Sequence, residues 1–387
     1  RGGAVTFEGS TDPRWHELER RAVLSQYLTA IHSSGPIPPQ ETGLMYNSWF
    51  GKPHLEMHWW HAAHFPMWGR ESYLERGLEW YNKILPKAIE LAESQGYKGA
   101  RWPKMTDYDG NQSPSAVAAV LIWQQPHPIA LAEYLYLANP SRQSLEKFKE
   151  IVYQSADFMA DYAVWREDRK AYVLGPPLIP AQECHKPMDS MNPPYELEYW
   201  RYGLETAAAW AERLGETPNP KWKEVADHLD ELPQKDGVYL AHANCPDTFE
   251  RYNRDHPSML GAMGMLPGKL VDPEVMRATV YKVKDVWQWP TSWGWDFPMA
   301  AMTAARLGER ALAVDYLLMD AQKNTYLPNG HNYQREGLYA YLPGNGGLLI
   351  AVAMMACGWQ GHEGEHAPGF PDDGSWKVQW EGLRPLL

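Results

Sequence analysis

The chain alternates short and long links between its predicted helices. Helical periodicity marks about twelve segments, at 14–32, 54–67, 70–94, 115–138, 141–164, 195–214, 219–230, 257–265, 273–286, 295–307, 309–321 and 346–357. A long stretch rich in Pro, Gly and Trp follows every second helix, beginning with the first, at 33–53, 96–114, 165–194, 232–256, 287–294 and 322–345. Six short links alternating with six long ones predict six helical hairpins in a ring, with the long loops at one face.

This pattern predicts an all-α (α/α)6 barrel over residues 1–370. The tail Trp376–Leu387, WKVQWEGLRPLL, alternates apolar and polar residues like a strand, so residues 371–387 are expected to form a short C-terminal β element. Long loops within a compact fold are usually functional. The site is therefore expected on the face that carries the long loops.

The composition excludes some classes of binding partner and favours others. The formal net charge of −12 argues against nucleic acid as a partner, and no long apolar run predicts a membrane span. The 19 Trp and 22 Tyr against 8 Phe suit a cleft that binds sugars, because these rings combine an apolar face with a polar edge. The alternative is a core rich in Trp. The cysteines, Cys184, Cys245 and Cys357, are spaced too widely for a metal motif and are either three thiols or one disulfide and one thiol.

The segment Tyr46–Arg70 gathers four histidines and four tryptophans. On a helix starting at His54, the residues His54, His58 and His61 would share one face. That arrangement is compatible with a metal triad, with a polar surface for a sugar, or with buried core histidines. No clear fourth ligand follows, and the sugar surface is the preferred interpretation. Glu56 would point away from the histidines on such a helix.

Three further segments hold candidate acids and bases. Glu183 lies in a Pro-rich loop before a helix and is either a general acid, with a pKa raised by apolar neighbours, or an ordinary loop carboxylate. Asp255 precedes another helix and is either an N-cap or a base that activates water. The last segments supply Asp296, His331, Glu336 and Asn345, and a Gly-rich run at 344–347 that is either a ligand contact or a plain turn.

Four of these segments, in this order, resemble the six-hairpin glycosidase superfamily, and in particular its inverting α-L-fucosidase and maltose/kojibiose phosphorylase families. They are KPHLEMHWWH, PAQE, DHPSMLGAMGMLPG and PGNGGLLIAVAMMACG. The resemblance implies that Glu183 is the general acid and Asp255 the general base. Lys52 and His54 stand where the fucosidases hold water with asparagines, and Glu56 stands at their glutamine. No phosphate site of the phosphorylase kind is evident.

We therefore expect an inverting glycoside hydrolase acting on an oligo- or polysaccharide, with Glu336 as the alternative base and with no metal or organic cofactor. The expected substrate contacts are His54, Glu56, His58, Trp59, Trp60, Arg101, Trp293, His331 and Asn345. The chain begins at Arg1, which suggests a mature or excised piece of a secreted or periplasmic protein. The resemblance also implies a flanking N-terminal β-sandwich domain, missing from this chain.

Three other functions remain open. A sugar epimerase would use a histidine pair drawn from His242, His256 and His331. A polysaccharide lyase would use Tyr or His beside a neutralising Asn or Arg. A barrel that binds glycans without catalysis is the third.

Overall fold

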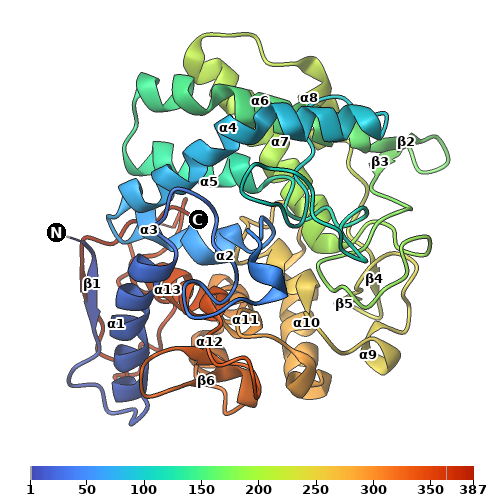
Figure 1. Ribbon diagram of the computed structural model, residues 1–387. Coiled ribbons are helices and arrows are strands. Elements are labelled where there is room, and N and C mark those ends of the chain that lie inside the picture. The colour runs from blue at the N-terminus through green and yellow to red at the C-terminus, as the bar shows by residue number, and fades with distance from the viewer. Residues whose placement is uncertain (1, 363) are drawn as a thin grey trace.

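The computed structural model describes residues 2–362 and 364–387, and its helices form two concentric rings (Figure 1). The inner ring consists of α2 (His58–Ala62) with α3 (His64–Met67), α5 (His127–Ala138), α7 (Pro194–Leu214), the 3₁₀ helix η2 (Ser258–Ala262), α11 (Asp296–Arg306) and α13 (Leu342–Cys357). Each packs against the next, and α13 packs against α2, which closes the ring. The predicted (α/α)6 barrel is confirmed.

The outer ring covers the inner one. It consists of α1 (Trp15–His32), α4 (Glu71–Ser94), α6 (Arg142–Tyr162), α8 (Pro220–Asp227), α10 (Pro273–Val286) and α12 (Arg310–Leu317). Outer and inner helices alternate along the chain, and each long loop runs from an outer helix to the inner helix that follows it. All inner helices therefore begin at the same face of the barrel, and their positive dipole ends point toward it.

Short β elements tie the barrel together. Strand β1 (Ala4–Thr6) pairs antiparallel with β8 (Gln379–Glu381), so the predicted tail strand joins the two ends of the chain. The other strand pairs lie within long loops: β2 (Val164–Arg166) with β3 (Ala171–Val173), β4 (Gln234–Lys235) with β5 (Val238–Tyr239), and β6 (Thr325–Tyr326) with β7 (Asn332–Tyr333). The loops also contain α9 (Thr248–Arg251), η1 (Trp49–Gly51), η3 (Trp289–Thr291) and η4 (Gln322–Asn324). In the described part of the chain, no helix meets the length and hydropathy needed to cross a bilayer.

Local sequence signals explain most helix ends. Ser141 caps α6 because its hydroxyl accepts a hydrogen bond from the Ser144 N–H, and Asp272 caps α10 in the same way. Gly215 ends α7 with a φ of 79°, a conformation that glycine adopts without strain.

The structure corrects two predicted helices. The segment predicted as helix 115–138 is helical only from His127, because Gln124 and Gln125 turn inward and donate to the Trp102 carbonyl. The segment predicted as helix 54–67 begins its helix at His58, since His54 forms a bridge with Met105 instead. A helical face shared by His54, His58 and His61 therefore does not exist.

The tryptophans serve mainly the core. Eight of the 19 are fully buried, namely Trp59, Trp60, Trp68, Trp102, Trp123, Trp200, Trp210 and Trp295. Trp60 stacks between α13 and Trp295, at a ring distance of 4.9 Å from Trp295. Burial of large rings, and not sugar contact, thus accounts for much of the unusual composition.

Glycines allow the ring to close. Gly346 lies in the first turns of α13, where a Cβ atom would stand 1.9 Å from the carbonyl oxygen of Trp60 in α2. Gly347 packs against the Trp60 ring itself. The Gly-rich run therefore brings two inner helices into contact and does not form a turn around a ligand.

We expect Gly346→Ala to lower the free energy of unfolding by about 1–3 kcal/mol, because the added methyl group forces backbone apart in a closed ring. Urea denaturation measures the loss. Gly35→Ala is the matched control, since a Cβ there meets nothing within 4 Å. Equal stability of the two variants would show that α13 does not need glycine at this position.

Candidate active site

One of the pockets formed by the long loops lies at the face where the inner helices begin. Its volume is about 90 Å³, and its lining residues are Glu41, Trp49, Glu56, Met57, Lys104, Glu183, Asp255, His256, Trp293 and Tyr341. A larger hollow, of about 260 Å³, lies beside α4, but its lining holds a single carboxylate, Glu90. We take the smaller pocket as the candidate active site because it alone of these two combines several carboxyl groups with aromatic rings.

Lys104 links two carboxyl groups of the pocket. Its Nζ lies 2.7 Å from Glu183 Oε1 and 3.7 Å from Glu56 Oε1. Burial would lower the pKa of Lys104, but Glu56 and Glu183 outweigh burial and raise it. Lys104 is therefore a permanent cation that can pair with either glutamate.

Two glutamates lie deeper and favour the protonated form. Glu56 is fully buried, and among the described residues neither of its carboxyl oxygens has a hydrogen-bond partner. Burial raises the pKa of Glu56 well above its usual range and that of Glu41 to about 8, although Lys104 opposes both shifts. Burial thus favours the protonated form of both carboxyl groups, and a protonated carboxyl group can donate a hydrogen bond to a hydroxyl.

Asp255 and His256 form the opposite side. The Nδ1–H of His256 donates to Asp296 Oδ1 at 2.8 Å, and Nε2 lies 3.6 Å from Asp255 Oδ1. Burial alone would lower the pKa of His256, but Asp296 and Asp255 raise it to about 9. His256 is therefore an imidazolium at neutral pH, and its ring stacks on Trp295 at a centroid distance of 4.0 Å.

Asp255 is held in an unusual backbone conformation. Its φ is 62°, which non-glycine residues rarely adopt and which recurs at functional sites. The Asp255 N–H donates to Thr291 Oγ1 at 2.9 Å, and Trp287 Nε1 donates to the Asp255 carbonyl at 2.8 Å. Burial raises the pKa of Asp255, while His256 opposes that shift. Asp255 is not the N-cap of a helix, because η2 begins after Pro257.

Aromatic rings complete the wall. The ring centroids of Trp49 and Trp293 lie 6.1 Å apart, and the ring centroid of Trp293 lies 5.4 Å from that of Tyr341. Asp296 Oδ2 accepts a hydrogen bond from the backbone N–H of Trp293 at 2.8 Å, so the same aspartate holds both the imidazolium and the backbone that carries this ring. Such faces suit the apolar side of a sugar ring.

The structure brings together only part of the predicted site. Glu56, Glu183, Asp255 and Trp293 line the pocket, and His54 lies next to it, with Nε2 4.0 Å from Glu41 Oε1. Sequence reasoning missed Glu41, Trp49, Met57, Lys104 and Tyr341, and considered His256 only for an epimerase. Each of these is an isolated residue in a long loop or at a helix start, so no local pattern marks it.

The other predicted contacts lie in the core or elsewhere. His58 contacts the Tyr81 hydroxyl at 3.1 Å, and Trp59 and Trp60 are buried. Arg101 donates to Gln95 and to the Ala119 carbonyl, and Asn345 donates to Ser25 and to the Gly330 carbonyl. These side chains have internal partners, so the structure gives them stabilising contacts in place of the predicted contacts to substrate.

Two predicted residues lie outside the pocket lining. His331 Nε2 lies 3.3 Å from His32 Nε2, in the loop before α13. Glu336, the alternative base, is exposed in a turn closed by the Arg335–Leu338 bridge. The structure therefore favours Asp255 over Glu336 by position.

The charge on His256 makes a pH-dependent contribution to stability. Its pKa rises from about 6.5 in an unfolded chain to about 9 in the fold. The stabilisation is therefore complete below about pH 6.5 and disappears as the pH rises through about 9. We expect the free energy of unfolding of the wild type to exceed that of His256→Gln by up to about 3 kcal/mol below pH 6.5. Urea denaturation across this range checks the trend, and a difference that stays constant with pH would contradict it.

Comparisons with known proteins show which solved structures share this fold. No family model matches the sequence, and no curated protein matches it significantly. A protein assigned as a kojibiose phosphorylase, from the human microbiome, superposes with a TM-score of 0.70 at 10% identity, over 92% of this chain. A wild-type glycosidase superposes with a TM-score of 0.65 at 16% identity, and a variant glycosidase in complex with glucose with 0.63 at 15%. The chain therefore shares its overall fold with these phosphorylase and glycosidase structures.

Coverage differs between these neighbours. The chain spans 57% of the length of the phosphorylase but 97% of each of the two glycosidase structures, which in turn cover 87% of this chain. The identities are low, so the comparisons establish the fold, and the chemistry must be argued from the pocket.

Proposed function

We propose that this protein hydrolyses a glycosidic bond in an oligo- or polysaccharide with inversion at the anomeric carbon. The observation that carries the proposal is the meeting of Glu183 and Asp255, from two different long loops, in one pocket with aromatic walls. Inverting glycosidases need two carboxyl groups on opposite sides of the bond, with room for a water molecule between one of them and the sugar. The glycosidase fold supports the same reaction class.

Glu183 is proposed as the general acid. Its side chain is 31% exposed, against 21% for Asp255, so it lies nearer the mouth, where the leaving group departs. In the ligand-free structure Lys104 holds Glu183 in an ion pair. Glu56 Oε1 lies 3.7 Å from Lys104 Nζ, so this carboxyl oxygen can accept a hydrogen bond from Lys104 when Glu183 takes up the proton that it must deliver.

Asp255 is proposed as the general base. The imidazolium of His256 lies beside it and favours the ionised carboxylate that accepts a proton from water. The fixed backbone at Asp255 limits the motion of the carboxylate. Asp296 contributes by holding His256 and Trp293 in place, without reaching the pocket surface itself.

The charges of the pocket favour water over phosphate as the attacking group. Four carboxyl groups line it, and the cations in the lining are Lys104 and His256, each of which already faces a carboxylate. A phosphate ion would have to displace these pairs. Hydrolysis therefore fits the pocket better than phosphorolysis.

Product analysis tests this choice. We expect cleavage of aryl glycosides or short oligosaccharides to release free sugar at the same rate with and without inorganic phosphate, because water is the acceptor. Chromatography of the products checks the result. Release of a sugar phosphate, or activity only in the presence of phosphate, would contradict hydrolysis.

The other functions find less support in the pocket. An epimerase needs two histidines at one sugar, but His256 lines the pocket while His242 lines another hollow and His331 contacts His32. A lyase needs a neutralising Asn or Arg, and the pocket lining contains neither. We propose a secreted or periplasmic location, where such substrates occur.

A further inference from the structure

A further hollow, of about 400 Å³, lies between two long loops and is distinct from the candidate active site in its lining. Its lining residues are His185, Lys186, Met188, Asp189, His242, Asn244, Cys245, Asp247 and Tyr252. None of them lines the pocket that holds Glu183 and Asp255. The proposed hydrolysis makes no use of this group.

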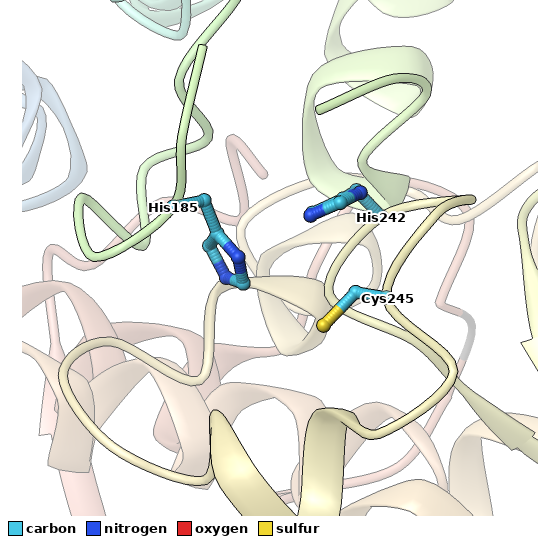
Figure 2. A group of neighbouring side chains, drawn as sticks. All are labelled: His185, His242 and Cys245. Atoms are coloured by element: carbon cyan, nitrogen blue, oxygen red, sulfur yellow. The ribbon is translucent and has the colours of Figure 1, made fainter. Parts of the chain in front are cut away.

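Three donors converge there. One donor atom from each of His185, His242 and Cys245 lies within 4.8 Å of the other two, and all three residues are buried. Figure 2 shows the two imidazoles and the thiol close together, with His185 on one loop and His242 and Cys245 on another. The His185 and His242 rings are 4.7 Å apart and nearly perpendicular.

One of these donors lacks a partner. His185 is 7% exposed, and within residues 2–362 and 364–387 its Nε2 has no hydrogen-bond partner. Its ring is fixed by stacking on Tyr252 at 4.8 Å. A buried imidazole nitrogen without a partner costs free energy unless it binds something.

The second imidazole, that of His242, would have to give up one hydrogen bond to bind a metal ion. The Asn244 N–H contacts His242 Nδ1 at 3.2 Å, which is long for such a bond. A metal ion could replace that contact at Nδ1, or bind at Nε2 with the ring proton moved to Nδ1. Either route gives up one weak hydrogen bond.

The surroundings offer a fourth ligand. Asp247 Oδ1 lies 3.7 Å from Cys245 Sγ, and Asp189 also lines the hollow. Lys186 in the lining and Arg254 near His185 carry opposing positive charges. With the thiolate that metal binding would create, the anionic groups outnumber these two cations, so the surroundings carry a net negative charge.

We propose that His185, His242 and Cys245 bind a divalent transition-metal ion, and that Zn²⁺ fits them best. Two imidazoles and one thiolate suit zinc, whereas Mg²⁺ and Ca²⁺ prefer oxygen ligands. The fourth position is filled by a carboxylate or water. On binding, the Cys245 thiol releases its proton to solvent and the Zn–S bond forms. His242 and Cys245 lie close in sequence, but His185 lies in the preceding long loop, so no single sequence motif contains all three residues.

The other buried group of this kind is a poorer candidate. Glu41, His54 and Glu56 also bring donor atoms within 4.8 Å of one another. Lys104 already supplies a positive charge beside Glu56, and a metal ion there would repel it. That group belongs to the candidate active site.

A metal ion would connect two loops of functional interest. His185 lies two residues after Glu183, and His242 and Cys245 lie in the loop between β5 and α9. Zinc would therefore hold the loop of the proposed general acid against its neighbour. The metal proposal stands on its own geometry and does not depend on hydrolysis being correct.

Cobalt substitution of the purified chain tests the site directly. We expect about one Co²⁺ per chain, with the near-ultraviolet absorption of a thiolate–cobalt bond and with displacement by Zn²⁺. Cys245→Ser and His242→Gln should lose this absorption. Two control variants should keep this absorption. They are Cys357→Ser, which changes a cysteine at the end of α13, and Cys184→Ser, which changes the cysteine next to His185 in the sequence. No thiolate–cobalt absorption in the wild type, or its persistence in Cys245→Ser, would overturn the proposal.

A second measurement needs no variant and covers the case of a variant that does not fold. Alkylation of the wild-type chain, followed by peptide mass spectrometry, should show that Zn²⁺ protects Cys245 and leaves the labelling of Cys357 unchanged. Equal labelling of Cys245 with and without Zn²⁺ would overturn the proposal.

Discussion

Glu183→Gln should lower kcat by about 10²–10⁴-fold on substrates with poor leaving groups, because the amide cannot supply the proton that the departing oxygen needs. Aryl glycosides whose leaving group is stable as an anion should lose far less activity, since they depart without protonation. Steady-state kinetics on a matched pair of substrates measures the difference. The amide is nearly the same size as the acid, and circular dichroism checks that the variant is folded.

One outcome would contradict the assignment of Glu183 as the general acid. If Glu183→Gln lost equal activity on both kinds of substrate, Glu183 would not be the general acid. Lys104→Met provides a related control, because it removes the ion pair with Glu183 but leaves the carboxyl group in place. That variant should keep more activity than Glu183→Gln on the poor leaving group.

Asp255→Asn should lower kcat by about 10²–10⁴-fold on both kinds of substrate, because the attacking water needs a base whatever the leaving group is. Added azide should restore turnover of an activated aryl glycoside in a variant with a smaller side chain, Asp255→Gly, since azide attacks without a base. Product analysis should show a glycosyl azide.

Glu336→Gln is the matched comparison for this prediction. Glu336 is exposed and outside the pocket lining, so this variant should retain activity. Loss of activity in Glu336→Gln with retention in Asp255→Asn would transfer the role of base to Glu336.

The arrangement of the barrel was predictable because it depends on repeated local signals. Helical periodicity and cap residues such as Ser141 recur along the chain, and the alternation of short and long links fixes which helix ends share a face. The main errors fell where a segment forms long-range contacts. Gln124 and Gln125 gain more from the Trp102 carbonyl than from extending a helix.

The site was less predictable, because its residues come from separate loops. Glu183 and Asp255 were found through motifs whose order resembles a known family. Glu41 and Lys104 carry no such motif, and their importance depends on burial and on each other's charge. Conversely, the segment from His58 to Trp60 has the composition of a sugar site but lies in the core, where Tyr81 and neighbouring tryptophans surround it.

The configuration of the first product tests the central claim most directly. Proton NMR can follow the anomeric signal of the sugar released from an aryl glycoside or oligosaccharide, before mutarotation mixes the two forms. The pocket with Glu183 and Asp255 predicts a first product of inverted configuration. A first product that retains the configuration of the substrate would contradict this account, because retention requires one carboxylate to attack the sugar itself.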